Sequence, residues 1–317
     1  MQGRIECARV DCMRYRRLDL NLLVALDAIL TERSVTRAAS KLCLSQPAVS
    51  GSLARLREYF EDPLIVQVGR QMELTPLAQA LGGSIRSIML QIDNAIATDP
   101  AFDPGVNKRH FIIAATDYVI EVLLLGLLRD LSRSAPGLTF EFRQFSAQSA
   151  QELQSGEADL VIGPEIDVRV EHPHVPVFED GYVVVACRDN PIVSAGMTFD
   201  EYMGLGHVVF RGERQGQPWL ERWFVKQYGD SRRIEVSVPS FLLLPSFLMG
   251  TNRIATLQSR LAHKLAGSAP LKVVEAPLEL PRLVEVLQWN AQRDVDPALR
   301  WLREQVLAAA AALPSSP

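Results

Sequence analysis

Two short apolar runs at helical spacing meet at Cys43-Leu44, and this arrangement restricts the fold of the 317-residue chain more than any other feature. Ser34 is a good N-cap for the first run, and Ser45, followed by Pro47, is a good start for the second. The positions expected to be buried are Val35, Ala38, Ala39 and Leu42, then Val49, Leu53, Leu56 and Phe60. The sequence therefore predicts two short helices joined by a tight turn.

The second of these helices carries polar side chains in its first turn. Gln46 and Ser50 fall off its apolar stripe, and Arg57 follows further along. Such a helix suits insertion into the DNA major groove, where Gln and Ser can reach base edges. The alternative interpretation is an ordinary helical hairpin with a solvated face, because short motifs also occur by chance.

The residues that follow favour the DNA-binding interpretation. Ile65–Val68 and Met72–Leu74 predict a small β-hairpin with Arg70 at its tip. Thr75-Pro76 then begins a long helix over about Leu77–Ala97. Two helices, a hairpin and a long helix in this order predict a winged helix-turn-helix followed by a linker helix.

These residues carry a family resemblance. The run from Leu18 to Pro76 resembles the N-terminal domain of LysR-type transcriptional regulators, through the phrases AASKLCLSQPAVS, LARLREYFEDPL and ELTP in this order. The resemblance extends along nearly the whole chain. The runs MRYRRLDLNLLVALDAILTER, HVVFRGERQGQPWLERWF and RIATLQSRLA are most similar to the subgroup of the nodulation activator NodD and the salicylate-responsive NahR type. One departure is Gly51, since many members carry a basic or amide residue there that can contact a base or a phosphate.

The motif and the resemblance together imply a protein that binds a double-stranded DNA operator. Gln46, Pro47 and Ser50 are expected in the major groove, and Ser45, Arg55 and Arg70 on phosphates. The resemblance further implies a homo-oligomer, a dimer through the linker helix and then a tetramer, which contacts RNA polymerase when it activates. The complete set of predicted DNA-binding residues is Ser34, Thr36, Arg37, Ser45, Gln46, Pro47, Ser50, Arg55 and Arg70.

The charge of the chain is unevenly placed along its length. The formal net charge is −4 at pH 7, but the stretch from Met13 to Pro76 holds nine basic and seven acidic residues. A weakly basic head on an acidic body fits a DNA-binding domain joined to a domain with another task. The length leaves room for two or three compact domains.

The composition is that of an ordinary soluble protein, with 48% hydrophobic and 22% charged residues. Its cysteines form no CxxC motif, so they predict neither a disulfide framework nor a zinc site. The N-terminus has no secretory hydrophobic core, and no apolar run is long enough to span a membrane. We therefore expect a cytoplasmic protein without membrane contact, metal or cofactor, in which residues 1–12 are a disordered extension.

Apolar residues recur at helical spacing along the predicted linker helix at 77–98. This stripe predicts a seam between two chains, because two DNA-binding heads on one seam can bind two half-sites. The alternative is that a single chain buries the stripe against its own body. The stripe consists of Leu77, Leu81, Ile85, Ile88, Ile92 and Ile96.

Strands and helices alternate in the second half of the chain. The strand Phe111–Ala115 precedes the helix Asp117–Ser134, and the helix Ala147–Ser155, capped by Gly156, precedes the strand Asp159–Gly163. Such alternation predicts an α/β domain with parallel strands. The resemblance implies two Rossmann-like lobes of the periplasmic-binding-protein kind, linked by two crossover strands.

The predicted domains follow from these elements. The winged helix-turn-helix occupies residues 13–76, the linker and dimerisation helix 77–98, and the effector-binding and oligomerisation domain 107–317. Within that last domain, lobe I is expected at about 107–178 and 273–317, and lobe II at about 179–272.

Ligands of open α/β sheets bind beyond the carboxyl ends of strands, near helix N-termini. In the first lobe Thr116, Phe145 and Ser146 lie at such ends, and the resemblance implies comparable places in the second lobe for Gly206-His207-Val208 and for the segment from Ser240 to Ser246. Phe145 and Phe210 can stack on an aromatic ring, and Thr116, Ser146 and His207 can form hydrogen bonds. We therefore expect a small aromatic effector between the lobes. The predicted effector-binding residues are Thr116, Asp117, Phe145, Ser146, Gly163, Pro164, His207, Phe210 and Ser246.

Some of these residues also have a plainer explanation. Thr116 and Asp117 can serve only to cap the following helix, and His207 can be a packed strand residue. Asp117 also disfavours a carboxylate beside it, because two like charges would be desolvated together. The expected effector is therefore neutral or phenolic, and flavonoid-like, rather than a simple benzoate.

An enzyme is the main alternative from another class. The chain contains no GxSxG, P-loop or GxGxxG motif, so no catalytic constellation is predicted. His172 and His174 are a weak metal pair without a third ligand nearby in sequence. The alternatives that stay open are a cytoplasmic enzyme of periplasmic-binding-protein fold, or a ligand-independent assembly domain, fused to a DNA-binding head.

Overall fold

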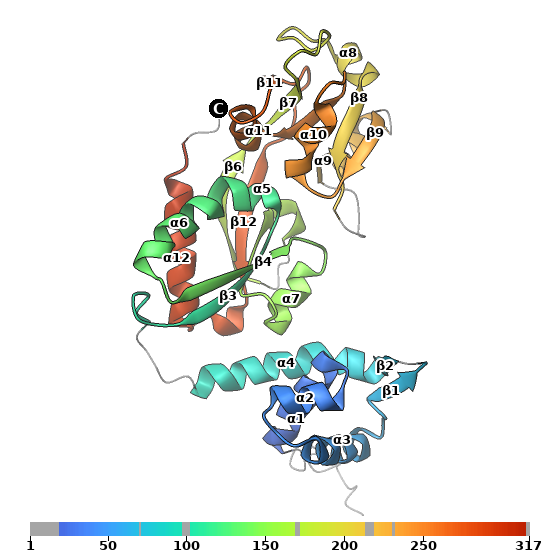
Figure 1. The fold of residues 1–317 in the computed structure, drawn as a ribbon, viewed down its shortest axis with the longest axis vertical. Coiled ribbons are helices and arrows are strands. Elements are labelled where there is room, and N and C mark those ends of the chain that lie inside the picture. Colours follow the sequence, from blue (N-terminus) through green and yellow to red (C-terminus); the bar gives the residue numbers. More distant parts are fainter. Residues whose placement is uncertain are drawn as a thin grey trace, which may run out of the picture. The chain divides into compact units, whose positions relative to one another are not determined.

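The computed structural model describes residues 19–69, 71–96, 102–168, 172–212, 219–229 and 232–314. The chain divides into two compact units, Met1–Ala97 and Thr98–Pro317 (Figure 1). The first unit is called the head below, and each unit is described by itself. The extension predicted at residues 1–12, and Arg70, lie outside the described residues.

The head confirms the predicted pair of helices and the hairpin that follows. The Ser34 hydroxyl accepts a hydrogen bond from the amide of Arg37, and the Ser45 hydroxyl accepts one from the amide of Ala48, so both serines are N-caps as expected. The elements are α1 (Leu20–Glu32), α2 (Val35–Lys41), α3 (Gln46–Phe60), β1 (Ile65–Val68), β2 (Gln71–Leu74) and α4 (Pro76–Ile96). The predicted long helix is thus confirmed as well.

The apolar stripe of α4 is divided between the core of the head and its surface. Ile85 is only 5% exposed and belongs to the same core cluster as Leu26 and Ile29 of α1. Leu77 and Ile88, by contrast, are 38% and 40% exposed. The prediction that the whole stripe forms one seam between two chains is therefore wrong for Ile85, which α1 covers within the same chain.

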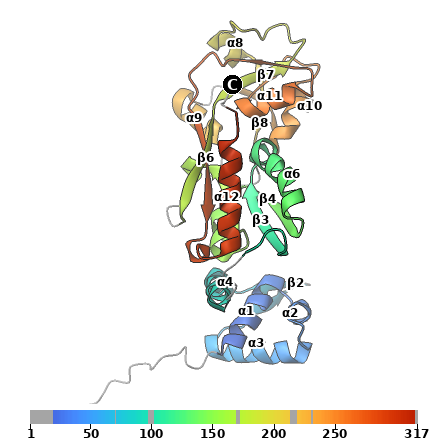
Figure 2. The same ribbon diagram turned by 90° about the vertical axis from the view of Figure 1, so that its left-hand side faces the viewer.

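The second unit consists of two α/β lobes, each built on a five-stranded sheet (Figures 1 and 2). The sheet orders are β4-β3-β5-β12-β6 in lobe I and β11-β7-β10-β8-β9 in lobe II. Lobe I contains β3 (Arg109–Ala115), α5 (Asp117–Val119), η2 (Ile120–Leu124), α6 (Leu125–Ser134), β4 (Leu138–Gln144), α7 (Ser149–Ser155), β5 (Leu160–Pro164), η3 (Glu165–Asp167), β6 (His174–Asp180), β12 (Leu283–Trp289), η5 (Ala291–Arg293) and α12 (Pro297–Ala311). Lobe II contains β7 (Tyr182–Cys187), α8 (Phe199–Gly204), β8 (Gly206–Phe210), α9 (Trp219–Tyr228), β9 (Arg233–Val238), η4 (Phe241–Leu243), α10 (Leu244–Leu248), β10 (Ile254–Gln258), α11 (Ser259–Ala266) and β11 (Leu271–Val274).

The chain passes between the lobes twice. It leaves the sheet of lobe I after Asp180 and returns between Val274 and Leu283, so the change of sheet falls a few residues from the expected limits at 178 and 272. Both sheets are mixed: β3 runs parallel to β4 and β5, whereas β12 pairs antiparallel with β5 and β6. The predicted parallel strands are thus confirmed in each lobe, for β3, β4 and β5 and for β8, β9 and β10, whereas one strand of each sheet, β12 in lobe I and β7 in lobe II, runs in the opposite direction.

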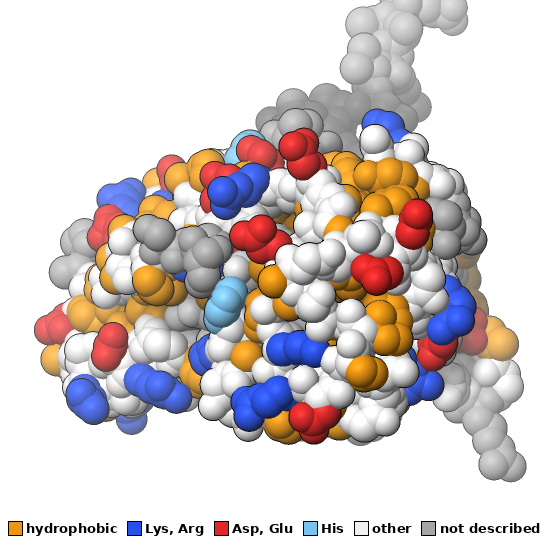
Figure 3. Space-filling model, turned by 90° about the horizontal axis from the view of Figure 1, so that it is seen from above, with side chains coloured by type: hydrophobic (Ala, Val, Ile, Leu, Met, Phe, Trp, Pro, Cys, Tyr) orange, Lys and Arg blue, Asp and Glu red, His pale blue; other side chains and the backbone are white. Residues whose placement is uncertain are grey.

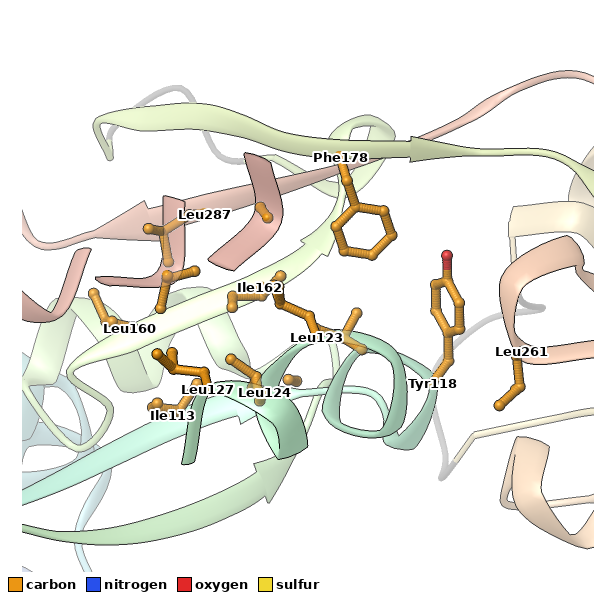
Figure 4. Packing of buried hydrophobic residues seen from close by; sticks show 14 of the residues in the cluster. Ile113, Tyr118, Leu123, Leu124, Leu127, Leu160, Ile162, Phe178, Leu261 and Leu287 are labelled. Atoms are coloured by element: carbon orange, nitrogen blue, oxygen red, sulfur yellow. The ribbon is translucent and has the colours of Figure 1, made fainter. Parts of the chain in front are cut away.

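The helix predicted over Asp117–Ser134 is one continuous run with a wider turn inside it. Residues Ile120–Leu124 are π-helical, between α5 and α6. There the ammonium group of Lys264, on α11 of lobe II, lies 2.9 Å from Glu121 Oε1 and donates to the Glu121 backbone carbonyl at 2.6 Å. Tyr118, just before this turn, is fully buried and lies between Phe178 and Leu261 in Figure 4. The π turn and Tyr118 thus join the cores of the two lobes.

The surface shown in Figure 3 carries basic and acidic side chains interspersed, without a patch of one sign. Within the part of the chain that the structure describes, none of the helices has the length and apolar character needed to cross a bilayer. The described residues also contain no cluster of three or more His, Cys, Asp or Glu side chains that could hold a metal ion.

Candidate functional site

The first turn of α3 is held by its buried side and leaves its polar side free. Val49, Leu53 and Leu56 are buried in the core of the head. Gln46, Pro47 and Ser50 are exposed on the other side of the helix. An exposed polar first turn fixed by a buried apolar stripe is the geometry that a base-contacting helix needs.

The predicted residues of α2 lie beside this turn in the sequence and are partly engaged within the head. Thr36 and Arg37 are exposed, and Ser34 is half-buried where it caps the helix. The guanidinium group of Arg37 lies 3.6 Å from the carboxylate of Glu32 and also donates to the backbone carbonyl of that residue. A phosphate would therefore compete with Glu32 for Arg37.

The two arginines of α3 have different surroundings. Arg55 is exposed, and no hydrogen bond or ion pair to it is found within the described part of the chain. Arg57 instead donates from Nε to the carbonyl of Pro63 at 2.8 Å and from a terminal nitrogen to the carbonyl of Ile65 at 3.1 Å. The interpretation of Arg57 as a groove residue is thus corrected: its guanidinium holds the start of the hairpin against α3.

Gly51 has open space around it. It is exposed, and a Cβ built on its backbone would meet no heavy atom within 4 Å. The glycine is therefore not required by packing within the head, and a longer side chain fits at this position.

A cavity of about 480 Å³ lies between the two lobes of the second unit. We call it the interlobe cavity. Lobe I lines it with Thr116, Phe145, Ser146, Ala147, Ala150, Val161, Pro164, Ile166, Asp167, Val168, Leu283, Glu285 and Gln288. Lobe II lines it with Tyr182, Phe210, Gly212, Leu220, Glu221, Arg222, Phe241, Thr256 and Gln258. Its volume is in the range of cavities that enclose small-molecule ligands.

Five of the nine predicted effector residues line this cavity: Thr116, Phe145, Ser146, Pro164 and Phe210. Thr116 has both of the roles considered for it, since its hydroxyl also accepts a hydrogen bond from the amide of Val119. Phe210 stacks on Phe241 with ring centroids 4.0 Å apart and an interplanar angle of 15°. Each ring therefore covers one face of the other, and the pair gives the cavity an aromatic part of its lining.

The other four predicted residues do not line the cavity. Asp117 instead bridges the lobes, because its Oδ2 accepts hydrogen bonds from the hydroxyl of Ser240 at 2.6 Å and the amide of Leu242 at 3.2 Å. Gly163 lies under Phe145, whose ring would come within 2.4 Å of any added Cβ. Ser246 is exposed on α10, outside the lining.

His207 requires the clearest correction. It is fully buried, and its Nε2 lies 2.9 Å from the backbone carbonyl of Tyr202, to which it donates. Burial, together with the nearby charge of Arg232, lowers the pKa of His207 to about 4. The residue is therefore a neutral, packed strand residue, as the plainer explanation had it, and not a group that meets a ligand.

The strongest polar groups of the cavity come from residues that sequence reasoning missed. Gln258 ends β10, and Glu285 and Gln288 lie within β12. All three are at most 5% exposed. A buried polar residue within an apolar strand demands a hydrogen-bond partner or a ligand, so LVEVLQW and IATLQ contained a usable signal.

Glu285 has an unusual electrostatic environment. Burial raises the pKa of its carboxyl to about 8, with further contributions from the negative charges of Asp167 and Asp180. Burial, followed by Asp180 and Glu285, likewise raises the pKa of Tyr118. Glu285 is therefore largely protonated at neutral pH, and the core of the site carries less negative charge than its residues suggest.

Comparison with known proteins identifies the family. Residues 20–79 match the family described as bacterial regulatory helix-turn-helix protein, lysR family, and residues 104–311 match the LysR substrate binding domain. The chain belongs to the LysR family of transcriptional regulators. The family resemblance inferred from the helix-turn-helix phrases is thus confirmed, and the predicted fold class with it.

Relatives of this LysR regulator cover most of its length. Nodulation protein D of Bradyrhizobium sp. (strain ANU 289) is 42% identical over 93% of this chain and 87% of its own. Nodulation protein D 1 of Rhizobium meliloti (strain 1021) is 40% identical over 93% and 96%. A solved structure described as a probable transcriptional regulator from Pseudomonas aeruginosa is 30% identical, with a TM-score of 0.65 over 93% of this chain and 98% of that one. The expected similarity to the NodD group within the LysR family is confirmed.

Proposed function

We propose that this LysR regulator controls transcription by binding an operator through α3 and a small aromatic effector in the interlobe cavity. The observation that supports the effector class most directly is the stacked pair Phe210–Phe241, because both aromatic residues line the cavity. A planar aromatic ligand gains apolar burial and ring–ring contacts against such a pair. Thr116 and Ser146 add hydroxyl groups on the side of lobe I.

The operator contacts follow from exposure. Gln46, Pro47 and Ser50 would contact base edges, while Ser45 and Arg55 would position the helix on phosphates. Arg70, at the predicted tip of the hairpin, and Ser34, Thr36 and Arg37 of α2 would complete the contacts to the DNA backbone. Replacing Gln46 with Ala should relax the sequence preference at one base pair by about 1–3 kcal/mol.

A change in the lobes would reach the DNA through an oligomer. In this proposal α4 pairs with the α4 of a second copy through its exposed apolar residues, Leu77 and Ile88, and two such dimers form a tetramer. An effector shifts the balance between two arrangements only by its differential affinity for them. RNA polymerase would be the partner when the change activates transcription.

The effector part is tested by calorimetry with a hydroxylated flavone on the full chain. Phe241→Leu should weaken binding roughly tenfold, because it removes one of the two stacked rings. Phe199→Leu is the matched control, since Phe199 lies in the same lobe and is half-buried but does not line the cavity. Equal effects of the two substitutions would exclude Phe241 from the effector site, and no binding of any aromatic would leave the second unit as a ligand-independent assembly domain.

A further inference from the structure

Two residues that line the interlobe cavity each have a buried side-chain oxygen atom without a hydrogen-bond partner within the described residues, and one such atom comes from each lobe. These atoms are Oε2 of Glu285 and Oε1 of Gln258. The two side chains are 1% and 4% exposed, so water does not replace the missing partners freely. A buried polar atom without a partner is costly, and a native protein keeps such an atom mainly where a ligand completes it.

These two oxygens come from different lobes. Glu285 lies in β12 of the lobe I sheet, and Gln258 ends β10 of the lobe II sheet. Both line the same cavity. A ligand that satisfies both would therefore be bonded to the two lobes at once.

The charges around the cavity disfavour an anionic ligand. Among its described lining residues, Asp167, Glu221 and Glu285 are acidic and Arg222 is the one basic residue. Arg222 is already paired with Asp167 across the lobes at 2.8 Å. Glu221 forms a buried ion pair with Arg232, which therefore offers no spare charge to the cavity. A carboxylate placed here would lose its hydration without gaining an unpaired cation.

The protonation state of Glu285 determines which hydrogen bonds its carboxyl group can form with a ligand. The titratable groups that interact electrostatically with the Glu285 carboxyl include no cation. They are Asp167 of η3, Asp180 of β6, Tyr118 of α5 and Tyr182 of β7. Burial raises the pKa of the carboxyl to about 8, so at neutral pH the group can both accept and donate a hydrogen bond. A phenolic hydroxyl can both donate to and accept from such a group, whereas a carboxylate only accepts and would leave the oxygen of Gln258 without a donor.

Resting on the aromatic effector proposed above, we infer that Glu285 and Gln258 are the specificity-determining pair of the cavity. They select an uncharged polyphenol whose hydroxyl groups reach both lobes, over a carboxylate of the same ring skeleton. The pair Phe210–Phe241 then contributes affinity for any planar ring, and the two oxygens determine which substituents that ring carries.

The test uses three flavones on one ring skeleton: trihydroxyflavone, carboxyflavone and unsubstituted flavone. Calorimetry on the full chain at neutral pH should give the highest affinity for trihydroxyflavone, an affinity roughly tenfold lower or more for unsubstituted flavone, and the lowest affinity for carboxyflavone. Gln258→Leu and Glu285→Leu should each weaken trihydroxyflavone roughly tenfold and leave unsubstituted flavone within about twofold. Glu285→Gln keeps a neutral donor and acceptor, so it should restore most of the affinity that Glu285→Leu loses.

Four other results of this experiment would overturn the inference. Equal binding of all three flavones, abolished by Phe241→Leu, would overturn the specificity pair while leaving the aromatic effector intact. Equal losses for the hydroxylated and unsubstituted rings in both leucine variants would reduce the two residues to a structural role and overturn the inference. Tighter binding of phenyltrimethylammonium than of trihydroxyflavone would overturn it too, since Glu285 would then act as an ionised partner of a cation. No binding of any aromatic probe would overturn the proposed effector together with the inference.

Discussion

The head and the second unit place their functional side chains in opposite surroundings. In the head, the candidate DNA contacts of α3 are exposed and lie within about three turns of one helix. In the second unit, Thr116, Gln258 and Glu285 are buried and come from three distant parts of the sequence. The comparison teaches that the head can change its exposed side chains at little cost to stability, whereas the second unit keeps buried oxygens of Gln258 and Glu285 that lack a partner and lower its stability.

The largest change in stability is expected on α4, which carries both a buried and an exposed isoleucine. Ile85→Asp should destabilise the head by about 3–5 kcal/mol, because it places a carboxylate in the core against α1. Ile88→Asp, on the 40% exposed side of α4, should leave head stability within about 0.5 kcal/mol and lower the mass of the oligomer. Urea unfolding followed by far-ultraviolet circular dichroism measures the first effect and light scattering the second. An unchanged mass for Ile88→Asp would place the contact between copies elsewhere.

The next largest effect is the pH dependence of stability that the buried Glu285 gives to the second unit. The folded pKa of Glu285, about 8, lies above its ordinary value near 4.5, so its contribution to stability is complete below that value and is lost as pH rises towards 8. Glu285→Gln should therefore match the parent at pH 5 and exceed its stability by a few kcal/mol at pH 8. All four tryptophans lie in the second unit, so their fluorescence during unfolding reports this unit selectively. The exposed Glu275→Gln is the control, and a parallel rise in both variants would refute the assignment.

A smaller effect on stability is expected to distinguish Arg57 from Arg55, the two arginines of α3. Arg57→Ala should cost about 1–2 kcal/mol of head stability, because the carbonyls of Pro63 and Ile65 lose their charged donor. Arg55→Ala should leave stability unchanged and reduce the slope of log affinity against log salt by about 0.9. Filter binding at several salt concentrations distinguishes them. If Arg57→Ala changed the salt slope and not the stability, the groove interpretation of Arg57 would return.

The smallest effect tests the open space at Gly51. Gly51→Ala should stabilise the head by about 0.5–1 kcal/mol, since glycine is unfavourable in a helix interior, and should not change operator affinity. Gly51→Lys should add a phosphate contact on top of that stabilisation, with a steeper salt dependence. Loss of binding in Gly51→Ala would mean that DNA approaches the backbone closely at this position.

The head could be predicted well because its signals are local. Ser34 and Ser45 cap the helices that follow them within three residues, and Thr75 does the same for α4. Such contacts depend on neighbours in the sequence, so a pattern of a few residues contains them. The burial of Ile85 against α1 was not predicted, because the spacing of apolar residues along a helix does not indicate which partner covers them.

The cavity could be predicted only in part because its residues meet through the topology. Strand ends of the first half, such as Thr116 and Phe145, followed from the general rule for α/β sheets. Glu285 lies more than a hundred residues away and reaches the cavity only because β12 crosses back between β5 and β6. The imidazole of His207 is a side chain that often contacts ligands, yet its place in β8 directs it to the backbone carbonyl of Tyr202.

Lys264 holds the π turn of lobe I through two different kinds of acceptor, the carboxylate of Glu121 and the backbone carbonyl of the same residue. Every amino acid supplies a backbone carbonyl, so half of this contact does not depend on which residue occupies position 121. Substitutions at position 121 should therefore leave the lobe junction partly in place, whereas replacement of Lys264 removes both halves together. A chain with lysine at position 264 can therefore exchange the residue at position 121 and still keep the backbone half of the contact between the lobes.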